Sequence, residues 1–328
     1  MSTTYGKYIV EQQGPPDVMK WVQEPVRSPS ASEVRVRHEA IGVDFIDTQI
    51  RGGLLPANLP TGLGFAGVGI AIEVGSDVKH IRVGDRVAYM YFTAGSYAEE
   101  RLVPGDRVIT LPDQSLSPEL AAGALFRGLT AWYLTNRLRP IGEGDTALVH
   151  AAAGGVGLIL IQWLALMGVK VVGTTETQEK VNVLREYGCA HACLLDHDDF
   201  VAKVREVSGG VGAAIVYESI GKATFERSLD SAKRFGLIAS FGWPSGDPGP
   251  VSLMELRNKG SLFITRPTVT QYTADAADFR AGATALFGLI KDGKLKIKVG
   301  NSYPLSQAAK AHADLFEGRT VGSTVLIP

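Results

Sequence analysis

The stretch from Leu148 to Gly157 reads LVHAAAGGVG and decides the fold of this chain. It follows an apolar run that begins at Thr146, and it opens a helical segment that Gly168 closes. Glycines let the backbone approach a pyrophosphate, and the free N–H groups of a helix start supply donors and positive potential. Ala152 stands where the usual G-x-G-x-x-G pattern has its first glycine. The strand, turn and helix in this order still predict a dinucleotide-binding turn, whose contact residues we expect to be Gly154, Gly155, Val156 and Gly157.

Short apolar strands alternate with helices along the chain after this turn. Because these strands are short, β-branched and separated by helices, they predict a parallel sheet covered by helices on both faces. The expected strands cover residues 146–150, 169–174, 213–217, 237–241 and 262–265, and the expected helices cover residues 156–167, 178–187, 198–207 and 224–233.

The first third of the chain is rich in strand and turn signals. Apolar and polar residues alternate over residues 33–40, a glycine-interrupted apolar run covers residues 65–74, and a further strand is expected over residues 86–89. Turn pairs separate these runs at Gly84-Asp85, Gly105-Asp106 and Pro112-Asp113. This pattern predicts a compact, barrel-like β domain.

Ser117 and Pro118 mark the change from strands to helices. Serine is a favoured N-cap and proline a favoured first helical residue, so a helix is expected from here towards Leu134, with a break near Gly128.

The chain after Pro267 returns to mixed structure. A helix is expected over residues 276–291, strands over residues 296–299 and 324–327, and a further helix from Ser306. We expect this tail to complete the first β domain.

The composition is that of a globular protein, with 45% hydrophobic and 20% charged residues and a formal charge of −1. No global positive field is available to recruit nucleic acid or an anionic membrane. The two cysteines, Cys189 and Cys193, exclude a disulfide framework and indicate a reducing compartment. Residues 1–16 show no secretory signal, and the most apolar stretch, Leu158 to Val169, is too short to span a bilayer. We therefore expect a cytoplasmic protein without membrane or nucleic-acid partners.

Further stretches complete a pattern that resembles a known family. The sequence resembles the quinone oxidoreductase (zeta-crystallin-like) family of zinc-free medium-chain dehydrogenases/reductases, and the likeness covers essentially the whole chain. The stretches that carry it are AIGVDFIDT (residues 40–48), LPTGLG (59–64), VKHIRVGDRV (78–87), GLTA (128–131), HAAAGGVGL (150–158), RSLD (227–230), KGSL (259–262) and TRP (265–267).

The resemblance implies an α/β protein of two domains. One is a GroES-like β-barrel catalytic domain made of residues 1–122 and 267–328, and the other is a Rossmann domain with a doubly wound parallel sheet, residues 123–266. It also implies NADPH as hydride donor, a small-molecule quinone or other conjugated carbonyl as acceptor, and a homodimer. We expect the two subunits to join through the strand at residues 262–265, which otherwise leaves an exposed edge.

By matching position, the resemblance also implies a set of residues that touch the cofactor. Beyond the glycine turn and the second-strand residues discussed next, they are Phe45, Ile46, Asp47, Thr48, Thr130, Tyr133, Ser219, Phe241, Gly242, Thr265, Arg266 and Arg319.

Residues after the second expected strand bear on the choice between NADPH and NADH. Glu176 lies about 20 residues past the turn, where an acidic residue accepts the ribose 2′-hydroxyl of NAD. Lys180 favours a 2′-phosphate instead, and the uncharged Thr175 leaves room for one. With Arg319 as a second cation we expect NADPH, with NADH as the alternative. Leu195 replaces a family tyrosine near that phosphate, so we expect a weak preference.

Three residues are candidates for the reaction centre. Asp44 stands where the family has asparagine, and it either donates a proton to the reduced product or caps a helix start. Arg127 replaces a family lysine, and it either stabilises negative charge on the acceptor oxygen or forms a structural ion pair. Thr130, which follows it on the expected helix, is the third. Two family tyrosines of the active site correspond to Gln49 and Leu55.

A zinc site is not expected. Zinc alcohol dehydrogenases need a Cys/His/Cys-type set, and the corresponding positions here are Asp44, Phe65 and Ala66. A conjugated, electron-poor acceptor takes hydride without a metal because the developing charge is delocalised. We therefore expect an NADPH-dependent quinone reductase. The alternatives are a 2-alkenal or enone reductase, and a cofactor-binding protein of low turnover.

Overall fold

The computed structural model describes residues 3–328 and divides into two compact units. Unit 1 comprises the described residues up to Arg127 together with Asp275–Lys291 and Ile297–Pro328. Unit 2 comprises Gly128–Ala274 and Asp292–Lys296. No helix within residues 3–328 is long and apolar enough to cross a membrane.

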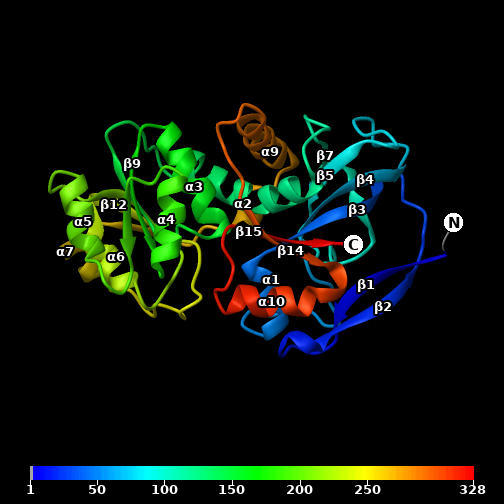
Figure 1. Cartoon of the computed structure of the whole chain (residues 1–328), viewed down its shortest axis with the longest axis horizontal. Coiled ribbons are helices and arrows are strands. Elements are labelled where there is room, and N and C mark those ends of the chain that lie inside the picture. Colours follow the sequence, from blue (N-terminus) through cyan, green and yellow to red (C-terminus); the bar gives the residue numbers. More distant parts are fainter. Residues whose placement is uncertain (1–2) are drawn as a thin grey trace. The chain divides into compact units, whose positions relative to one another are not determined.

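Unit 2 is built on a six-stranded parallel sheet in the order β10-β9-β8-β11-β12-β13, of which Figure 1 labels β9 and β12. Every residue of the two central strands, β8 and β11, is buried, as a sheet covered on both faces requires. The chain winds outwards from β8 in one direction and from β11 in the other, so the strand order reverses between these two strands. This is the doubly wound arrangement, in which ligands bind at the reversal point. The strands are β8 (Thr146–Val149), β9 (Lys170–Thr175), β10 (His191–Leu194), β11 (Ala213–Glu218), β12 (Ala232–Ser240) and β13 (Phe263–Thr265).

Helices cover both faces of this sheet. Val172 of β9 packs in one core cluster with Phe200 and Phe225, which come from two helices on the same face. The next residue, Gly173, faces the opposite helix layer, because a Cβ there would lie 3.5 Å from Leu184 Cδ1. The helices are α3 (Gly155–Leu166), α4 (Gln178–Glu186), α5 (Phe200–Val207), α6 (Phe225–Ser231), α7 (Leu253–Asn258) and α8 (Val269–Tyr272).

Unit 1 contains a seven-stranded sheet and a separate β1-β2 hairpin. The long strand β3 (Glu33–Val43) organises the sheet, because β4 (Ala66–Val74) pairs along one edge while β6 (Glu100–Pro104) and β15 (Ser323–Ile327) pair with the two halves of the other. The remaining elements are β1 (Thr4–Val10), β2 (Met19–Pro25), β5 (Arg86–Met90), β7 (Val108–Thr110), β14 (Val299–Pro304), α1 (Phe45–Gly52), α9 (Ala276–Lys291), α10 (Ala308–Phe316) and three 3₁₀ turns, η1 (Pro16–Val18), η2 (Gly105–Arg107) and η3 (Leu305–Gln307).

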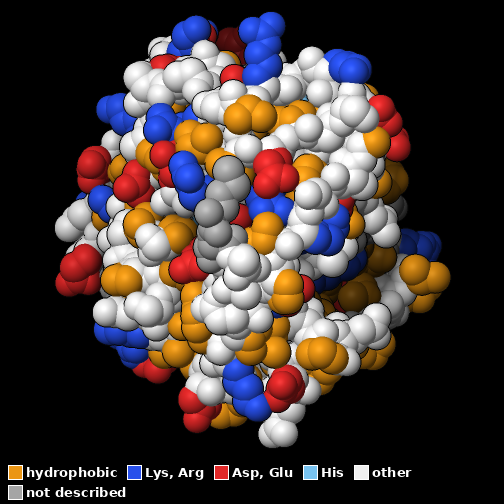
Figure 2. All heavy atoms as spheres, turned by 90° about the vertical axis from the view of Figure 1, so that its right-hand side faces the viewer, with side chains coloured by type: hydrophobic (Ala, Val, Ile, Leu, Met, Phe, Trp, Pro, Cys, Tyr) orange, Lys and Arg blue, Asp and Glu red, His pale blue; other side chains and the backbone are white. Residues whose placement is uncertain are grey.

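Charged side chains of both signs are mixed on the surface. Figure 2 shows one face of the molecule, on which Lys and Arg are interspersed with Asp and Glu rather than gathered by sign. Ion pairs such as Lys7 with Glu24 and Arg27 with Glu33, each at 2.8 Å, contribute to this pattern in unit 1. The distribution agrees with the formal charge of −1.

Helix α2 (Pro118–Asn136) shows which sequence signals were correct at this junction. It begins at Pro118, and Ser117 Oγ accepts the Leu120 N–H at 3.2 Å, so the predicted cap is confirmed. The predicted break near Gly128 is wrong, because α2 continues to Asn136.

The unit boundaries differ from those predicted at three places. Residues 123–127 belong to unit 1, where Arg127 pairs with Asp44. Residues 267–274 belong to unit 2, where the Tyr272 ring stacks on Tyr133 with centroids 4.7 Å apart. Residues 292–296 also belong to unit 2.

Two predicted elements needed correction. The strand expected over residues 296–299 lies at Val299–Pro304 instead, because Gln162 binds both the N–H and the carbonyl of Lys296 and removes them from any ladder. The helix expected over residues 224–233 ends at Ser231, since Ala232 already pairs with Ala213 of β11.

Candidate active site

The carboxyl ends of the parallel strands bring most of the predicted cofactor residues of unit 2 together. Carboxyl ends of parallel strands lie at one edge of a sheet, so residues that directly follow them are neighbours in space. Gly154 to Gly157 lie in the turn and helix start after β8. Glu176, Ser219 and Arg266 directly follow β9, β11 and β13, and Phe241 and Gly242 directly follow β12. Thr175 and Thr265 are the last residues of β9 and β13.

The turn between β8 and α3 has the geometry of an anion site. Ala151 adopts a positive φ of 47°, and a Cβ on Gly157 would lie 2.6 Å from the Ala151 carbonyl oxygen. Helix α3 therefore starts directly against the turn, which only glycine permits. Gly154 is the N-cap, and as a glycine it has no side chain to cap the helix start. The first N–H groups of a helix lack intrahelical partners, so the turn fits the pyrophosphate of a dinucleotide.

The end of β9 holds the two residues of opposite charge. The Glu176 carboxylate accepts a hydrogen bond from Thr175 Oγ1 at 3.3 Å and pairs with Lys180 Nζ at 3.1 Å. The Glu176 side chain is half-exposed, whereas that of Lys180 is largely covered. Glu176 therefore does not turn away from Lys180, and a 2′-phosphate arriving here would compete with this carboxylate for the ammonium group.

The loops after β11 and β12 are in tight contact. Ser219 Oγ donates to the His150 carbonyl at 3.0 Å, immediately before the glycine turn. A Cβ on Gly242 would lie 2.6 Å from the Ser219 carbonyl oxygen, so this approach also needs glycine. Arg266 donates to the Ser240 carbonyl at 2.7 Å, and burial lowers its pKa below the ordinary value.

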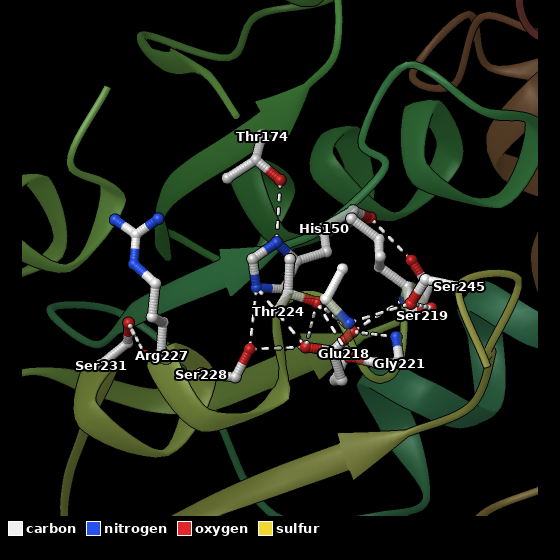
Figure 3. A network of polar contacts seen from close by, with 12 residues as sticks. His150, Thr174, Glu218, Ser219, Gly221, Thr224, Arg227, Ser228, Ser231 and Ser245 are labelled. Atoms are coloured by element: carbon white, nitrogen blue, oxygen red, sulfur yellow. Dashed lines mark hydrogen bonds and ion pairs between the residues drawn. The ribbon is translucent and has the colours of Figure 1, made fainter. Parts of the chain in front are cut away.

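A buried network of five polar side chains lies at the strand-order reversal, and sequence reasoning missed most of it (Figure 3). We call it the His150–Glu218 network. It consists of His150, Thr174, Glu218, Thr224 and Ser228, all buried. Glu218 accepts from Ile220 N at 2.7 Å, Gly221 N at 3.0 Å, Thr224 Oγ1 at 3.0 Å and Ser228 Oγ at 2.5 Å. The acidic residue at the end of the otherwise uncharged strand AAIVYE is the sequence signal that could have revealed it.

Helix α2 carries two further predicted residues, Thr130 and Tyr133, which are both buried. The Tyr133 hydroxyl donates to the Pro267 carbonyl at 3.5 Å, and burial raises the pKa of this phenol above its ordinary value. Because Tyr133 also stacks on Tyr272, its ring is fixed by unit 2 itself.

Asp44 and Arg127 lie together in unit 1. Asp44 is the N-cap of α1, and its Oδ1 lies 3.3 Å from Arg127 Nη2 in a buried ion pair. Arg127 also donates to the carbonyls of Val43 and Gly123. Burial raises the pKa of Asp44, and the guanidinium of Arg127 opposes that rise. Asp44 therefore does cap a helix start, and Arg127 does form a structural ion pair, as the alternative interpretations of these two residues expected.

Asp47 was among the predicted cofactor contacts, but its carboxylate is engaged inside unit 1. It accepts from Asp44 N at 2.9 Å, Gly64 N at 3.2 Å and Tyr97 Oη at 3.1 Å. Burial, and next the Asp44 carboxylate, raise the pKa of Asp47 to about 7. The structure thus gives Asp47 the role of holding α1, with Phe45, Ile46 and Thr48 on the same helix.

Arg319 follows α10 in unit 1, whereas Lys180 belongs to unit 2. Arg319 Nη2 pairs with Asp314 at 2.6 Å, and the Arg319 guanidinium also contacts Glu317. A phosphate would therefore have to share Arg319 with two carboxylates.

Comparison with known proteins agrees with this architecture. The profile described as "Alcohol dehydrogenase GroES-like domain" matches residues 30–113, and the one described as "Zinc-binding dehydrogenase" matches residues 155–287. The chain is 42% identical over 316 residues to the quinone oxidoreductase of Pseudomonas aeruginosa, covering 96% of this chain and 97% of that protein. The chain belongs to the quinone oxidoreductase family.

Two other members of this group of relatives are informative. The 2-haloacrylate reductase of a Burkholderia species is 38% identical and covers 98% of both chains. The crystal structure of the Escherichia coli quinone oxidoreductase complexed with NADPH aligns with a TM-score of 0.94 at 39% identity, covering 98% of this chain and all of that one. The family resemblance and the two-part α/β fold predicted from the sequence are confirmed: unit 1 is of the GroES-like type and unit 2 of the Rossmann type.

The residues present do not fit a zinc ion, although one matching profile is described as zinc-binding. Structural and catalytic zinc sites gather three or four Cys, His or carboxylate ligands. Within residues 3–328 no group of three or more such side chains is placed to hold a metal. Cys189 and Cys193 are buried, and burial raises the pKa of each thiol to about 11. We therefore derive no chemistry through a metal.

Proposed function

We propose that this protein reduces quinones and related conjugated carbonyls with hydride from NADPH, without a metal ion. The observation that carries the proposal is the convergence of the predicted cofactor residues on the carboxyl ends of β8, β9, β11, β12 and β13, in a chain about 40% identical to quinone oxidoreductases over nearly its full length. NADPH, when bound, supplies the hydride from its nicotinamide ring.

The residues of unit 2 bind and orient the cofactor in this proposal. Gly154 to Gly157 and the start of α3 hold the pyrophosphate. Thr175 and Lys180 receive the 2′-phosphate, and Ser219, Phe241, Gly242, Thr265 and Arg266 line the path towards the nicotinamide. Thr130 and Tyr133 of α2 complete this set.

Asp44 and Arg127 act on the acceptor. Negative charge develops on the acceptor oxygen as hydride arrives, and a guanidinium stabilises such charge. Asp44 donates a proton to the reduced product and is left as the carboxylate that pairs with Arg127, the state seen in the structure. Burial raises the pKa of Asp44 and so favours its reprotonation before the next turnover.

A second candidate, reduction of activated alkenes, is favoured by the 2-haloacrylate reductase relative at 38% identity. An electron-poor carbon–carbon double bond conjugated to a carbonyl or carboxylate accepts hydride for the same reason that a quinone does. The two activities therefore differ in the shape of the acceptor pocket and not in the cofactor site.

A panel of acceptors tests both candidates. NADPH consumption is measured with 1,4-benzoquinone, 9,10-phenanthrenequinone, a 2-alkenal and a 2-haloacrylate, and NADPH binding is measured separately. Quinone-dependent consumption is expected. Consumption with alkenes alone would transfer the assignment to the second candidate, and NADPH binding without turnover of any acceptor would show a cofactor-binding protein.

We further propose a homodimer joined through β13. This strand is the edge of the unit 2 sheet, its Phe263 is 57% exposed, and Leu253 and Met254 of α7 are also exposed. Exposed apolar edge strands promote pairing with another chain. Phe263→Lys should yield monomers in light scattering at micromolar concentration, whereas Val211→Lys, at an equally exposed apolar site in unit 2, should not. A monomeric wild-type protein would contradict the proposal.

The unpaired thiols of Cys189 and Cys193 and the use of NADPH support the cytoplasm as the compartment.

A further inference from the structure

The His150–Glu218 network has no role in the proposed chemistry, yet it lies where the strand order reverses. His150 directly follows β8 and Glu218 ends β11, the two strands between which the reversal occurs. Figure 3 shows the imidazole of His150 between Thr174 and Ser228, with Glu218 beyond Ser228. The network therefore joins β8, β9, β11 and α6 beside the glycine turn.

The hydrogen bonds of this network run in one direction. A carboxylate only accepts, so the single hydroxyl proton of Ser228 goes to Glu218 Oε2 at 2.5 Å. Ser228 Oγ must then accept from His150 Nε2, which lies 3.0 Å away. The neutral imidazole has one N–H, so His150 Nδ1 accepts from Thr174 Oγ1 at 2.8 Å. The sequence of donors is Thr174 to His150 to Ser228 to Glu218, and it fixes the Nε2–H tautomer.

Burial makes each hydrogen bond of the network costly to lose. All five side chains are at most 4% exposed, so a donor or acceptor that loses its partner cannot turn to water instead. Burial also lowers the pKa of His150, against the influence of Glu218, so the ring stays neutral as the donor sequence requires.

The network reaches the loops of the proposed cofactor site through Glu218 and through the backbone of His150. Glu218 Oε1 accepts the N–H groups of Ile220 and Gly221 and thereby shapes the turn after β11. That turn is tight, because Gly221 has a φ of +94° and a Cβ there would lie 2.4 Å from the Gly246 carbonyl oxygen. The same turn begins with Ser219, which bonds to the His150 carbonyl. One carboxylate thus sets the turn after β11 relative to the glycine turn after β8.

We propose that Glu218 and His150 are positioning residues for the dinucleotide, and that the one-way hydrogen-bond sequence through Ser228 sets the spacing between the turn at residues 151–157 and the turn at residues 219–221. The inference rests on the proposed function, since the dinucleotide is the ligand for which this spacing matters. Neither side chain needs to touch the ligand for this role.

Two serines of α6 provide a matched test. Ser228 and Ser231 are both fully buried, and each donates one hydrogen bond, Ser228 to Glu218 and Ser231 to the Arg227 carbonyl at 2.9 Å. Ser228→Ala should weaken NADPH binding about tenfold by titration calorimetry, the effect of one hydrogen bond to a charged group. Ser231→Ala should change it less than about twofold, and Ser228→Thr, which keeps the hydroxyl, should restore it.

A second measurement reads the network without ligand or turnover. Nitrogen-15 NMR of the imidazole, assigned by loss of the signal in His150→Gln, should report the Nε2–H tautomer in the wild-type protein. Glu218→Gln should convert it to Nδ1–H. The amide oxygen must face the N–H groups of Ile220 and Gly221, so the amide NH₂ donates to Ser228 and every later bond reverses.

The outcomes separate this inference from the proposed function. An Nδ1–H tautomer in the wild-type protein, or equal NADPH affinity in Ser228→Ala and Ser231→Ala, would overturn the inference alone. A wild-type protein that binds no NADPH would overturn the proposed function, and with it the ligand assigned here. If Ser228→Ala does not fold, the tautomer in the wild-type protein and in Glu218→Gln still decides the direction of the network.

Discussion

Lys180 is the residue on which the choice of cofactor depends. Its ammonium group pairs with Glu176 at 3.1 Å, so NADPH gains a contact there only by competing with that carboxylate. A charge-assisted hydrogen bond to phosphate is worth about 1.5–3 kcal/mol, or about tenfold or more in affinity. Lys180→Ala should therefore raise the Michaelis constant for NADPH by about tenfold and leave that for NADH nearly unchanged.

Two variants sharpen this test. Glu176→Gln removes the competitor and should lower the Michaelis constant for NADPH. Lys203→Ala removes the lysine of another ion pair, that with Glu206 on α5, and should alter neither constant. An equal effect of Lys180→Ala on both cofactors would show that Glu176, bound to the ribose of NADH, governs the site.

Arg127 offers a second residue-level prediction, on stability. Removing one partner of a buried ion pair leaves the other charge uncompensated, which costs about 3–5 kcal/mol. Arg127→Met should therefore destabilise the protein by that amount at neutral pH in denaturant unfolding. Arg127 opposes the rise in the pKa of Asp44, so the loss of Arg127 raises that pKa further. As the pH falls, Asp44 becomes protonated in the variant, and the loss of stability caused by Arg127→Met should become smaller.

The exposed pair of Lys20 and Glu11 in unit 1 is the control. Its side chains are more than half exposed, so Lys20→Met should cost less than about 1 kcal/mol. Similar losses in Arg127→Met and Lys20→Met would mean that the Asp44–Arg127 pair is not buried in solution.

Reasoning from the residues alone, without the family resemblance, extended only to features that act locally. The glycine turn was predicted because Gly154 to Gly157 act through their own backbone, and the cap at Ser117 because it bonds three residues ahead. The contacts of Glu218 and the structural role of Asp47 were not predicted, because both depend on how the folded chain brings side chains and backbone together. Glu218 contacts Ser228 and Thr224, and Asp47 contacts Tyr97 and Gly64.

At the level of elements, the junction of β8 and α3 depends on Gly157. An alanine Cβ there would lie 2.6 Å from backbone atoms of Ala151 and Ala152, so the backbone must shift. Gly157→Ala should destabilise the protein by about 1–3 kcal/mol and weaken NADPH binding more than tenfold. Thermal unfolding and titration calorimetry measure the two effects.

Gly288 in the last turn of α9 is the matched control. A Cβ there meets nothing within 4 Å, so Gly288→Ala should stabilise the protein by about 1 kcal/mol through helix propensity alone. NADPH affinity undiminished in Gly157→Ala would remove the glycine turn from the cofactor site.

The bounds of helices and strands were predicted correctly where a long run of apolar residues recurs with helical spacing. They were predicted wrongly where a contact between distant residues determines where an element begins. Helix α9 has the predicted bounds of residues 276–291. Strand β14 is displaced because Gln162 holds the backbone of Lys296, a contact between residues far apart in the sequence. Strand β10 was not predicted, because its four residues, HACL, include no β-branched side chain and no Phe, Tyr or Trp.

At the level of the whole molecule, the division into units could be predicted only approximately. The family resemblance implied a boundary after residue 122, but α2 is one continuous helix whose first half belongs to unit 1 and second half to unit 2. The resemblance does not locate a division inside a helix. The contacts of Arg127 with Asp44 and of Tyr133 with Tyr272 do, and they depend on the fold.

The buried histidines predict how the whole molecule responds to acid. Burial lowers the pKa of His38 to about 4 and that of His312 to about 3, and it also lowers that of His150. Below about pH 6.5 these residues bind protons in the unfolded state and not in the folded one, so stability falls with pH. Asp44 and Asp47 act in the opposite sense, because burial raises their pKa values and the folded state keeps their protons.

His38 gives this response a size, because its pKa of about 4 in the folded protein lies well below the ordinary value for histidine. Near pH 5 unfolding therefore lets this one ring take up about one proton, which lowers the free energy of unfolding by about 1.4 kcal/mol per pH unit of acidification. His38→Gln should reduce the pH dependence in denaturant unfolding by about that amount, whereas substitution of the exposed His197 by Gln should leave it unchanged. An unaltered slope in His38→Gln would contradict a buried neutral ring.

The pairing of β15 with β3 has a consequence for biosynthesis. Ribosomes release a chain from its N-terminus, so residues 128–274, a continuous segment, can emerge and fold as most of unit 2 while unit 1 is still incomplete. During that time the edge of β3 at Ile41 to Val43 has no partner, because Thr324 to Leu326 are made much later. The nascent protein therefore exposes an open strand edge until these residues have been synthesised, and chaperones should matter most to its yield during this interval.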